Sequence, residues 1–540
     1  MLRKLTVLLA ASLTLQGARA QSWQDTLAKI ETAFAQFKPD IAGAQFAISR
    51  NGKVIFSKAW GMADLEHNVP MTTTSLIEAG SVSKQFTAAS ILMLEQMGKL
   101  SVDDDVRKYI PELPEYGHPI KISHLLHHSS GLKDWGAVAS LNGWPRAEKN
   151  YTNDDALRII CRQKTLNYVP GAEYIYSNSN YTLLALIVER VSKESLEAFT
   201  KAHIFTPAGM SGSLWRMDLR RMVPNRAVAY GIGNGMLYVN MPNESVYGHA
   251  GLLTTAEELL KWNELYTTGK FGSPSLYAKQ TETVPLTGGQ PAMYAAGLMT
   301  TPFNGFPAVT HSGATAGYRC NLEYFPEQGM SFAFLSNTSQ FDRSPTNPAA
   351  LARNIFIPEP LPKNPPPPPA PAIAIQEETL RSFAGWYRYE PNDQPIKITY
   401  SDGKLYDNTQ QLKIEGANAF RNSGGLRYVF GNGDLTLVTK ENSRFVFKRA
   451  ENPDTAAHSQ FTGEYLSEEA EARWTIGLDN KNLVVKVDRP GYDSPMKPLY
   501  KDAFETELGL VRFLCDGQNR VTGLEVTSGR ARKVPFTKAK

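Results

Sequence analysis

A run of prolines most constrains how this chain can fold. Residues 358–371 read Pro-Glu-Pro-Leu-Pro-Lys-Asn-Pro-Pro-Pro-Pro-Pro-Ala-Pro. Proline fixes φ and lacks an N–H donor, so such a segment favours polyproline II and builds no hydrophobic core. The chain has 540 residues, which is too long for one ordinary core. We therefore predict a stiff linker over residues 358–373 that separates two differently folded regions.

The N-terminus has the pattern of a secretory signal. Arg3 and Lys4 precede an apolar run from Leu5 to Leu15, and small residues surround a cleavage site near Ala20. We expect residues 1–20 to be removed and the mature protein to be periplasmic or secreted. The run is too short to span a bilayer, and no later segment reaches the roughly 18 to 20 apolar residues that a membrane helix needs, so we expect no permanent membrane anchor.

Composition and charge exclude several classes of protein. The chain is 42% hydrophobic and 20% charged, as in soluble multidomain proteins. Its formal charge of +4 falls to +1 when residues 1–20, with three basic and no acidic residues, are removed. Such a balance argues against nucleic acid as a partner. Cys161, Cys320 and Cys515 allow one disulfide at most and form no Cys-x-x-Cys pair.

Residues 21–357 carry both helical and strand patterns. Apolar spacing predicts a helix over residues 23–37, and Asn51-Gly52 predicts a hairpin between strands at 45–49 and 53–57. Further elements are a helix near 181–191, a helix capped by Thr255, and strands near 309 and 332–335. Mixed elements of this kind predict an α/β (α+β) domain with an antiparallel sheet flanked by helices.

Beyond the linker the pattern is all-β. Short alternating runs lie between turn signals such as Asp402-Gly403 and Asp516-Gly517. The pattern Phe-x-Gly-x-Tyr begins at Phe383 and again at Phe461, each time before a strand-rich stretch. We predict two related small antiparallel β-barrels or sandwiches, over residues 374–455 and 456–540. One larger β domain with a chance repeat remains the alternative.

Ser81 and Lys84 form a Ser-x-x-Lys motif at the start of an apolar helix. A lysine one helical turn after a serine lies on the same face and can lower the cost of removing the hydroxyl proton. The N–H groups at a helix start also favour a developing oxyanion. The same spacing recurs before turn or proline signals at Ser130, Ser401 and Ser494. Ser81 is therefore the predicted nucleophile.

An acyl-transfer site also needs a group that donates a proton to the leaving group and groups that position the substrate. Two further motifs supply candidates for these roles. Tyr176-Ser177-Asn178 leads into the helix near 181–191; the tyrosine could move a proton, and the asparagine could hydrogen-bond Lys84 and a substrate amide. His311-Ser312-Gly313 lies on a predicted strand, where glycine lets a substrate backbone approach the edge.

The order and surroundings of these motifs carry a family resemblance. From about residue 40 to 340 the chain resembles serine hydrolases of the superfamily that holds class C β-lactamases, low-molecular-weight penicillin-binding proteins, D-aminopeptidases and related esterases. The matching segments are Gly80–Lys84, His124–Leu132, Pro170-Gly171 with Tyr176 and Asn178, Gly251–Thr255, and His311–Gly313 with Gly317-Tyr318.

The resemblance implies a role for each motif residue. Ser81 would be the nucleophile, Lys84 and Tyr176 the base and proton shuttle in an order that stays open, and Asn178 a polar positioner. The backbone N–H groups of Ser81 and Ala314 would form the oxyanion hole, and His311, Gly313 and Ala314 would contact the substrate.

His311 departs from the β-lactamase pattern, which has a lysine there. Loss of that charge should weaken binding of penicillins and C-terminal carboxylates about ten- to a hundredfold. A histidine here, with two appended β domains, resembles the D-aminopeptidase branch, whose substrates carry a free amine.

The function that we expect is an exported serine hydrolase that cleaves amide or ester bonds through an acyl-enzyme on Ser81. The D-aminopeptidase-like peptidase is the leading interpretation, and an esterase or β-lactamase of the same superfamily is the alternative. A penicillin-binding sensor or catalytically silent binding protein is the alternative from another class. The expected partner is a small-molecule or peptide substrate. We expect no cofactor and no metal, because His124, His127 and His128 have no carboxylate at ligand spacing.

Overall fold

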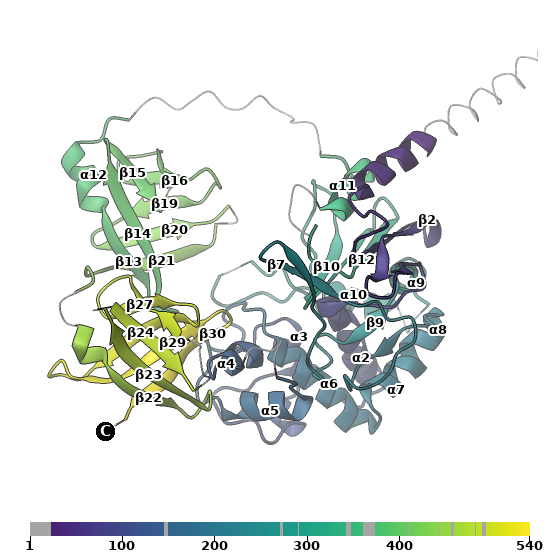
Figure 1. The fold of residues 1–540 in the computed structure, drawn as a ribbon, viewed down its shortest axis with the longest axis horizontal. Helices are drawn as coiled ribbons and strands as arrows, with labels where there is room; N and C mark the ends of the chain where they lie inside the picture. Colours follow the sequence, from purple (N-terminus) through teal and green to yellow (C-terminus); the bar gives the residue numbers. More distant parts are fainter. Residues whose placement is uncertain are drawn as a thin grey trace, which may run out of the picture. The chain divides into compact units, whose positions relative to one another are not determined.

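The computed structural model describes most of the chain (Figure 1). The predicted signal peptide and most of the predicted linker lie outside the described residues. Within the described part, no helix is long and apolar enough to cross a membrane. The structure describes residues 23–539 apart from 145–148, 271–273, 290, 342–346, 360–372, 409, 441, 455–457, 481 and 489–492.

The chain divides into two compact units, each formed by segments that are distant in sequence. The first unit comprises Met1–Gln96, Ser192–Glu282 and Tyr294–Asn364. The second unit comprises Met97–Val191, Thr283–Met293 and Pro365–Lys540. Each unit is described by itself below.

The first unit is built on a five-stranded antiparallel sheet with the order β10-β11-β12-β1-β2. The Asn51-Gly52 turn joins β1 to β2 as predicted, and both of its residues have positive φ, 50° and 75°. The edge strand β10 carries the third motif. The strands are β1 (Ala44–Arg50), β2 (Lys53–Trp60), β10 (Val309–Thr315), β11 (Tyr318–Phe325) and β12 (Met330–Ser336).

Helices cover both faces of this sheet. The helix over residues 23–34 and α11 (Pro348–Phe356) bury an aromatic cluster against Phe46 and its neighbours. On the other face, α9 (Ala256–Thr268) begins after the predicted cap Thr255, and the Ala256 N–H donates to Gln45 Oε1 at 3.0 Å. The alternation of Phe46 and Gln45 toward opposite faces is the period of two that a sheet covered on both sides requires.

Shorter elements complete the first unit. They are β3 (Met62–Asp64), β4 (Val69–Pro70), β5 (Ile77–Glu78), the 3₁₀ turn η1 (Gly80–Ser83), α2 (Lys84–Gln96), α7 (Leu196–Thr200), the π-helical turn η3 (Lys201–Phe205), α8 (Thr206–Ala208), β6 (Leu214–Trp215), β7 (Tyr230–Gly233), β8 (Met236–Val239), β9 (Leu252–Thr254) and α10 (Pro274–Thr281).

The second unit combines helices with two β-barrels. Its helical elements are η2 (Val106–Lys108), α3 (Ile122–Leu126), α4 (Trp135–Ser140), α5 (Asn153–Arg162), α6 (Asn178–Ser192), α12 (Glu377–Phe383) and η4 (His458–Phe461). The predicted helix near 181–191 is α6, which begins at Asn178 of the second motif.

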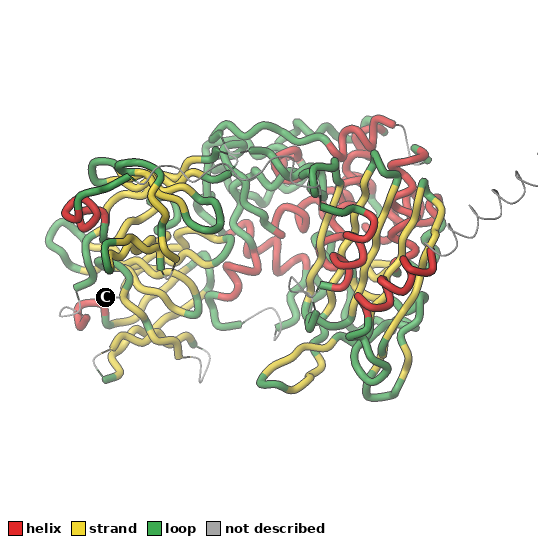
Figure 2. The backbone as a smooth tube through the Cα atoms, turned by 90° about the horizontal axis from the view of Figure 1, so that it is seen from above, coloured by secondary structure: helices red, strands yellow, loops and turns green. Residues whose placement is uncertain are grey.

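The two barrels are antiparallel sheets of nine described strands with the same connectivity. Figure 2 shows the strand-rich region near the C-terminus to which they belong. The first has the order β16-β15-β14-β13-β21-β20-β19-β18-β17, and the second has the order β25-β24-β23-β22-β30-β29-β28-β27-β26. The first contains β13 (Gly385–Tyr389), β14 (Gln394–Ser401), β15 (Lys404–Asp407), β16 (Gln410–Gln411), β17 (Lys413–Ile414), β18 (Ala419–Arg421), β19 (Arg427–Phe430), β20 (Asp434–Val438) and β21 (Arg444–Ala450). The second contains β22 (Gly463–Ser467), β23 (Ala472–Asp479), β24 (Asn482–Val487), β25 (Asp493–Pro495), β26 (Lys497–Pro498), β27 (Ala503–Thr506), β28 (Gly509–Cys515), β29 (Val521–Ser528) and β30 (Ala531–Lys538).

The repeated Phe-x-Gly-x-Tyr pattern has the same structure in both barrels. The hydroxyl of Tyr387 donates to the Phe383 carbonyl at 2.9 Å, and the hydroxyl of Tyr465 donates to the Phe461 carbonyl at 2.7 Å. The glycine between them starts the first strand of each barrel. The predicted fold class is therefore confirmed: a helix-flanked antiparallel sheet followed by two related barrels. The alternative of one larger β domain is wrong.

All three cysteines are free. Burial raises the pKa of the Cys161 thiol to about 11, and Cys320 is also buried in a strand. The sheet and the two barrels are therefore folded without the single disulfide that three cysteines would permit.

Candidate active site

Ser81 lies in the tight turn that precedes helix α2. The sequence predicted that Ser81 enters a helix; the structure places it in η1, one 3₁₀ turn before α2 starts at Lys84. Gly80 explains the difference, because its φ of 51° is left-handed and bends the chain into the turn. A side chain at this position would lie 2.7 Å from the backbone nitrogen of Ala314, so the turn needs glycine for close approach as well.

Lys84 lies directly beside the predicted nucleophile. Its ammonium donates to Ser81 Oγ at 3.2 Å and to the carbonyl oxygen of His249 at 2.8 Å, and its side chain is fully buried. A buried cation needs such partners, because burial without them is strongly unfavourable. The arrangement places one basic nitrogen within reach of the hydroxyl proton.

A glycine-rich loop holds the carbonyl that Lys84 contacts. The Thr87 hydroxyl donates to the Gly248 carbonyl at 2.8 Å, which fixes the loop on α2. Gly248 and Gly251 both have positive φ, 93° and 99°. His249 could not be recognised as a site residue from the sequence, because it contributes its backbone carbonyl and not its imidazole. The two glycines around it were the available signal of an unusual backbone.

A buried ion pair anchors the same loop. Arg216 Nε lies 2.9 Å from Glu78 Oε2, and both side chains are essentially inaccessible. The Arg216 N–H donates to the Gly251 carbonyl at 2.7 Å, and its guanidinium donates to the Glu244 carbonyl. Glu78 lies just before the turn that contains Ser81, and Arg216 contacts the loop that contains His249. The buried ion pair therefore connects this turn to this loop.

Strand β10 runs against the nucleophile turn through Gly313. A side chain at Gly313 would lie 2.0 Å from the Ala79 carbonyl and 3.1 Å from the Ser81 nitrogen. The backbones of Ser81 and Ala314, whose N–H groups the resemblance assigns to an oxyanion hole, are therefore neighbours. Two backbone donors held by close main-chain contact need no reorganisation to receive a developing negative charge.

His311 is neutral and engaged on both nitrogens. Burial, followed by the positive charge of Lys84, lowers the pKa of His311 to about 3. Its Nδ1 lies 2.6 Å from the Ser312 carbonyl, which can only accept, so Nδ1 carries the proton. Nε2 is then the acceptor for the Tyr294 hydroxyl at 2.9 Å. The sequence missed Tyr294, and β10 presents a neutral histidine where the β-lactamase pattern has a cation.

Tyr176 and Asn178 belong to the second unit, unlike the other predicted site residues. The Asn178 N–H donates to Asp134 Oδ2 at 2.7 Å, and the Ser177 N–H donates to His128 Nδ1 at 3.2 Å. The rings of His128 and Tyr176 lie 4.3 Å apart between centroids. His128 is fully buried and Asp134 almost so. The second motif is thus fixed by the segment that follows α3, which matched the family pattern at His124–Leu132.

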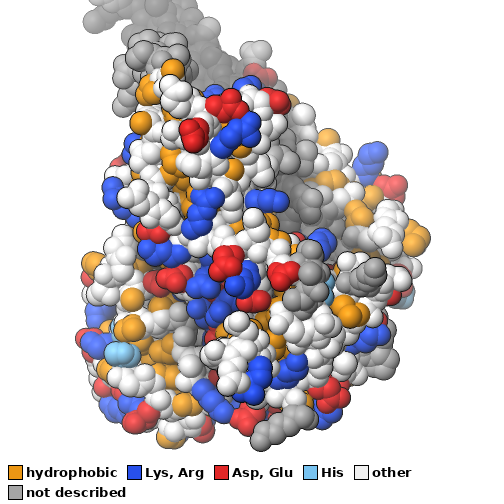
Figure 3. All heavy atoms as spheres, turned by 90° about the vertical axis from the view of Figure 1, so that its left-hand side faces the viewer, with side chains coloured by type: hydrophobic (Ala, Val, Ile, Leu, Met, Phe, Trp, Pro, Cys, Tyr) orange, Lys and Arg blue, Asp and Glu red, His pale blue; other side chains and the backbone are white. Residues whose placement is uncertain are grey.

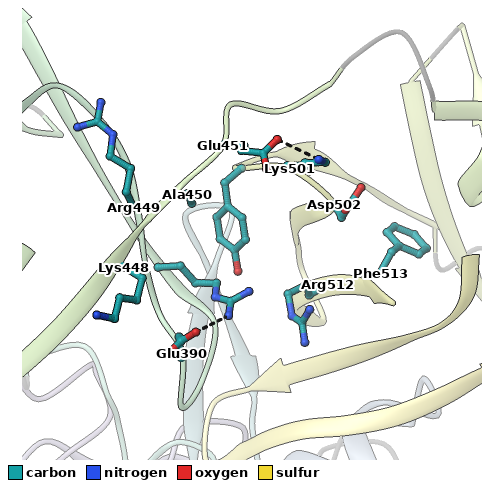
Figure 4. Close-up of a pocket in the computed structure, with 11 residues that line it drawn as sticks. Glu390, Lys448, Arg449, Ala450, Glu451, Lys501, Asp502, Arg512 and Phe513 are labelled. Atoms are coloured by element: carbon teal, nitrogen blue, oxygen red, sulfur yellow. Dashed lines mark hydrogen bonds and ion pairs between the residues drawn. The ribbon is translucent and has the colours of Figure 1, made fainter. Parts of the chain in front are cut away.

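A separate pocket in the second unit lies where the two barrels meet (Figure 4). Its volume is about 370 Å³, and its lining contains no residue of the three motifs. Lys501 is paired with Glu451 at 2.9 Å, and Arg388 with Glu390 at 3.2 Å. Figure 3 shows the face that carries the barrels, where basic and acidic side chains gather side by side. Opposite charges of the lining thus pair with one another, and the pocket shares no residue with the three motifs.

Metal ligands do not gather in the described structure. Across the described parts of residues 23–539, no three His, Cys, Asp or Glu side chains come together as a metal site would require. The described residues of the first unit bring together Ser81, Lys84 and the backbone of Ala314.

Comparison with known proteins agrees with this arrangement. The β-lactamase family model matches residues 27–355. The D-aminopeptidase of Gluconobacter oxydans is 30% identical over 298 residues, which are 55% of this chain and 55% of that protein. The chain thus matches about half the length of that relative. The D-aminopeptidase of Brucella anthropi is 24% identical over 524 residues, 92% of this chain and 95% of that protein.

The solved structures agree on the fold. An octameric penicillin-binding protein homologue from Pyrococcus abyssi superposes with a TM-score of 0.55 at 24% identity, over 79% of this chain and 99% of that one. The chain belongs to the β-lactamase family of hydrolases, since the family model covers more than half of it.

Proposed function

We propose that the protein is an exported serine hydrolase that cleaves amide or ester bonds through an acyl-enzyme on Ser81, with short peptides or amides of D-amino acids as its substrates. The observation that carries this proposal is the 3.2 Å hydrogen bond from buried Lys84 to Ser81 Oγ, within a turn held against the Gly313 backbone. The three motifs occur in the family's order.

In the acylation step, Ser81 Oγ attacks the carbonyl carbon of the scissile bond while its proton passes to Lys84 or to Tyr176. A neutral Lys84 amine can keep its bond to the His249 carbonyl and accept the hydroxyl proton with its lone pair. The carbonyl oxygen becomes an oxyanion, which the N–H groups of Ser81 and Ala314 receive. The proton then passes to the leaving nitrogen or oxygen, and the bond to it breaks.

In the deacylation step, water replaces the leaving group. The base that took the serine proton now takes a proton from water, and the hydroxide attacks the acyl carbon. Collapse of the second oxyanion releases the acid and returns the proton to Ser81 Oγ. No oxidant, reductant or further group is needed for the balance.

The neutral His311 supports the choice of substrate class. In the β-lactamase pattern a lysine on this strand holds the substrate carboxylate; β10 offers no cation in that place, because His311 stays uncharged above pH of about 3. The relatives named above that span this chain most fully are D-aminopeptidases. An esterase or β-lactamase activity, or a binder that acylates without turnover, are the competing outcomes.

The deciding experiment compares hydrolysis of D-alanine p-nitroanilide with that of its L-enantiomer by the mature protein. Ser81→Ala provides the blank. A D-selective rate that disappears in the variant supports the proposal. A rate on p-nitrophenyl esters or on a chromogenic cephalosporin, without one on the anilides, would instead assign the esterase or β-lactamase activity. Acylation without turnover on every substrate would assign a binding protein.

A further inference from the structure

One turn of the second barrel places an arginine on the second motif. Strands β29 and β30 are joined at Gly529-Arg530, and the Arg530 Cζ lies 4.6 Å from the centroid of the Tyr176 ring. Both residues belong to the second unit. The sequence analysis assigned Arg530 no role, because nothing near it in sequence resembles a motif.

The barrel that carries this turn is docked by buried polar contacts. Lys133 Nζ lies 2.9 Å from Glu469 Oε2, and the two side chains are 0% and 2% exposed. The indole N–H of Trp474 donates to the Leu141 carbonyl at 2.7 Å, also in the interior. A buried pair of this kind is costly to separate, because each charge would lose its partner. The barrel is therefore a fixed support for the turn.

The backbone of the turn is fixed as well. The Arg530 carbonyl accepts from the Asn167 side-chain amide at 3.0 Å and from the Asp134 N–H at 3.3 Å. The Arg532 N–H donates to Asn167 Oδ1 at 2.8 Å, and its guanidinium pairs with Glu173 at 3.0 Å. These four polar contacts of Arg530 and Arg532 fix the backbone of the turn. The Arg530 side chain therefore extends toward Tyr176 from a fixed Cα position.

The guanidinium itself keeps its donors available. Its nearest ion pair in the described structure is Asp134 Oδ2 at 3.9 Å, beyond hydrogen-bond distance, and that oxygen already accepts from the Asn178 N–H. The Arg530 side chain is 45% exposed. A positioned, half-exposed arginine with unused donors presents the planar fork that matches a carboxylate.

We propose that Arg530 is a substrate-binding residue that holds a carboxylate of the substrate beside the bond being cleaved. The proposal rests on the function proposed above, which gives Tyr176 the role of a proton shuttle. The family's usual cation on β10 is replaced by His311, which is neutral here. In this proposal the positive charge that binds an anionic substrate belongs to Arg530 of the last barrel and not to a residue of the third motif.

The carboxylate can come from either side of the scissile bond. On the leaving side it is the C-terminus of a dipeptide such as D-alanyl-D-alanine, which also carries the free amine of the proposed substrate class. On the acyl side it is an acidic group attached to the amino acid, as in N-succinyl-D-alanine p-nitroanilide. Both present the same two oxygens to the guanidinium.

The test measures kcat/KM for matched pairs that differ in this charge. One pair is D-alanyl-D-alanine and its C-terminal amide, and the other is the N-succinyl and N-acetyl p-nitroanilides of D-alanine. In Arg530→Gln the preference for the carboxylate member of at least one pair should fall about ten- to a hundredfold, while its neutral partner changes less than about threefold. The pair that responds identifies the side. Arg530→Lys should keep part of the preference, because it retains charge without the fork.

Arg520→Gln provides the matched control, since Arg520 lies on the same barrel and is exposed in a pair with Asp516. It changes the net charge equally and should leave all four rates unaltered. Equal loss on charged and neutral substrates in Arg530→Gln would overturn the proposal and make Arg530 a positioning residue for Tyr176. No loss on either pair would also overturn it.

Binding separates failure of this proposal from failure of the proposed function. If the wild-type protein cleaves none of the four substrates, the proposed function fails. Calorimetric binding of the N-succinyl anilide and of D-alanyl-D-alanine to Ser81→Ala, with and without Arg530→Gln, then still decides the role of Arg530. Affinity that drops about tenfold or more with the arginine supports it, and unchanged affinity rejects it.

Discussion

The two regions that carry the motifs are held in place by different physical means. Around Ser81, main-chain groups touch: Gly313 leaves no room for a side chain against Ala79, and Lys84 is held by a backbone carbonyl. Around Tyr176 the contacts are made by charged and polar side chains. Asp134 accepts a hydrogen bond from the Asn178 N–H, and the Arg530 guanidinium lies over the Tyr176 ring. Close backbone packing fixes atoms that must not move, whereas side chains can be exchanged to suit different substrates.

The difference teaches where specificity can change in such a protein. A substitution that alters main-chain contact near Ser81 should disturb the chemistry for every substrate, because the proposed nucleophile and the two proposed oxyanion donors would shift together. A substitution among the side chains around Tyr176 changes which substrate is accepted. Single substitutions in each region distinguish these two cases.

Gly313→Ala should produce the largest effect. Its new methyl group would lie 2.0 Å from the Ala79 carbonyl, so β10 must move away from the nucleophile turn. The loss of one oxyanion donor costs about 10² to 10³ in kcat, and we expect a decrease of that order on all substrates. Gly477→Ala is the control, because a side chain there meets no atom within 4 Å. Equal activity of the two variants would show that β10 does not need its close contact.

Asp134→Asn should have an intermediate effect. The substitution keeps the shape but removes the charge from a 2.7 Å hydrogen bond to the Asn178 N–H, which should cost about 1 to 2 kcal/mol of stability and roughly tenfold in kcat. Chemical denaturation and steady-state kinetics measure the two effects. Asp105→Asn is the matched control, since Asp105 also caps a helix in the second unit without contacting a motif. If the control lowers kcat as much, the interpretation of Asp134 is wrong.

His311→Gln should change kcat least among these substitutions, and its main effect should be on the pH dependence of stability. The pKa of His311 is about 3 in the folded protein, below its ordinary value of 6.5, so the unfolded chain binds more protons between these two pH values. Stability from this residue is present above pH 6.5 and is lost as the pH falls toward 3.

The wild-type advantage over His311→Gln should therefore shrink on acidification, by up to about 1.4 kcal/mol per pH unit. Urea unfolding of both proteins at a series of pH values measures the difference, and other titrating groups cancel in it. A difference that stays constant from neutral pH to pH 4 would show that folding does not lower the pKa of His311.

The local parts of the structure could be predicted from the sequence. The Asn51-Gly52 hairpin, the Thr255 cap and the closeness of Ser81 and Lys84 all depend on residues a few positions apart, whose geometry follows from helix and turn chemistry. The repeated Phe-x-Gly-x-Tyr pattern predicted two barrels because each copy makes the same local tyrosine contact.

The contacts that could not be predicted join distant segments. The His249 carbonyl lies 165 positions from Lys84, and it is a backbone group that no residue type reveals. Arg530 reaches Tyr176 only because Lys133 and Trp474 help to dock the last barrel. Tyr294 lies 17 positions before His311 and bonds its ring, a contact that depends on burial and not on the motif itself.

The most direct test of the account is the intact mass of the protein, quenched in acid during turnover of D-alanine p-nitrophenyl ester. The account predicts an added mass of one D-alanyl group, located on the peptide that contains Ser81 and absent from Ser81→Ala. An adduct on another residue, or turnover by Ser81→Ala at the wild-type rate, would contradict the claim that Ser81 is the nucleophile.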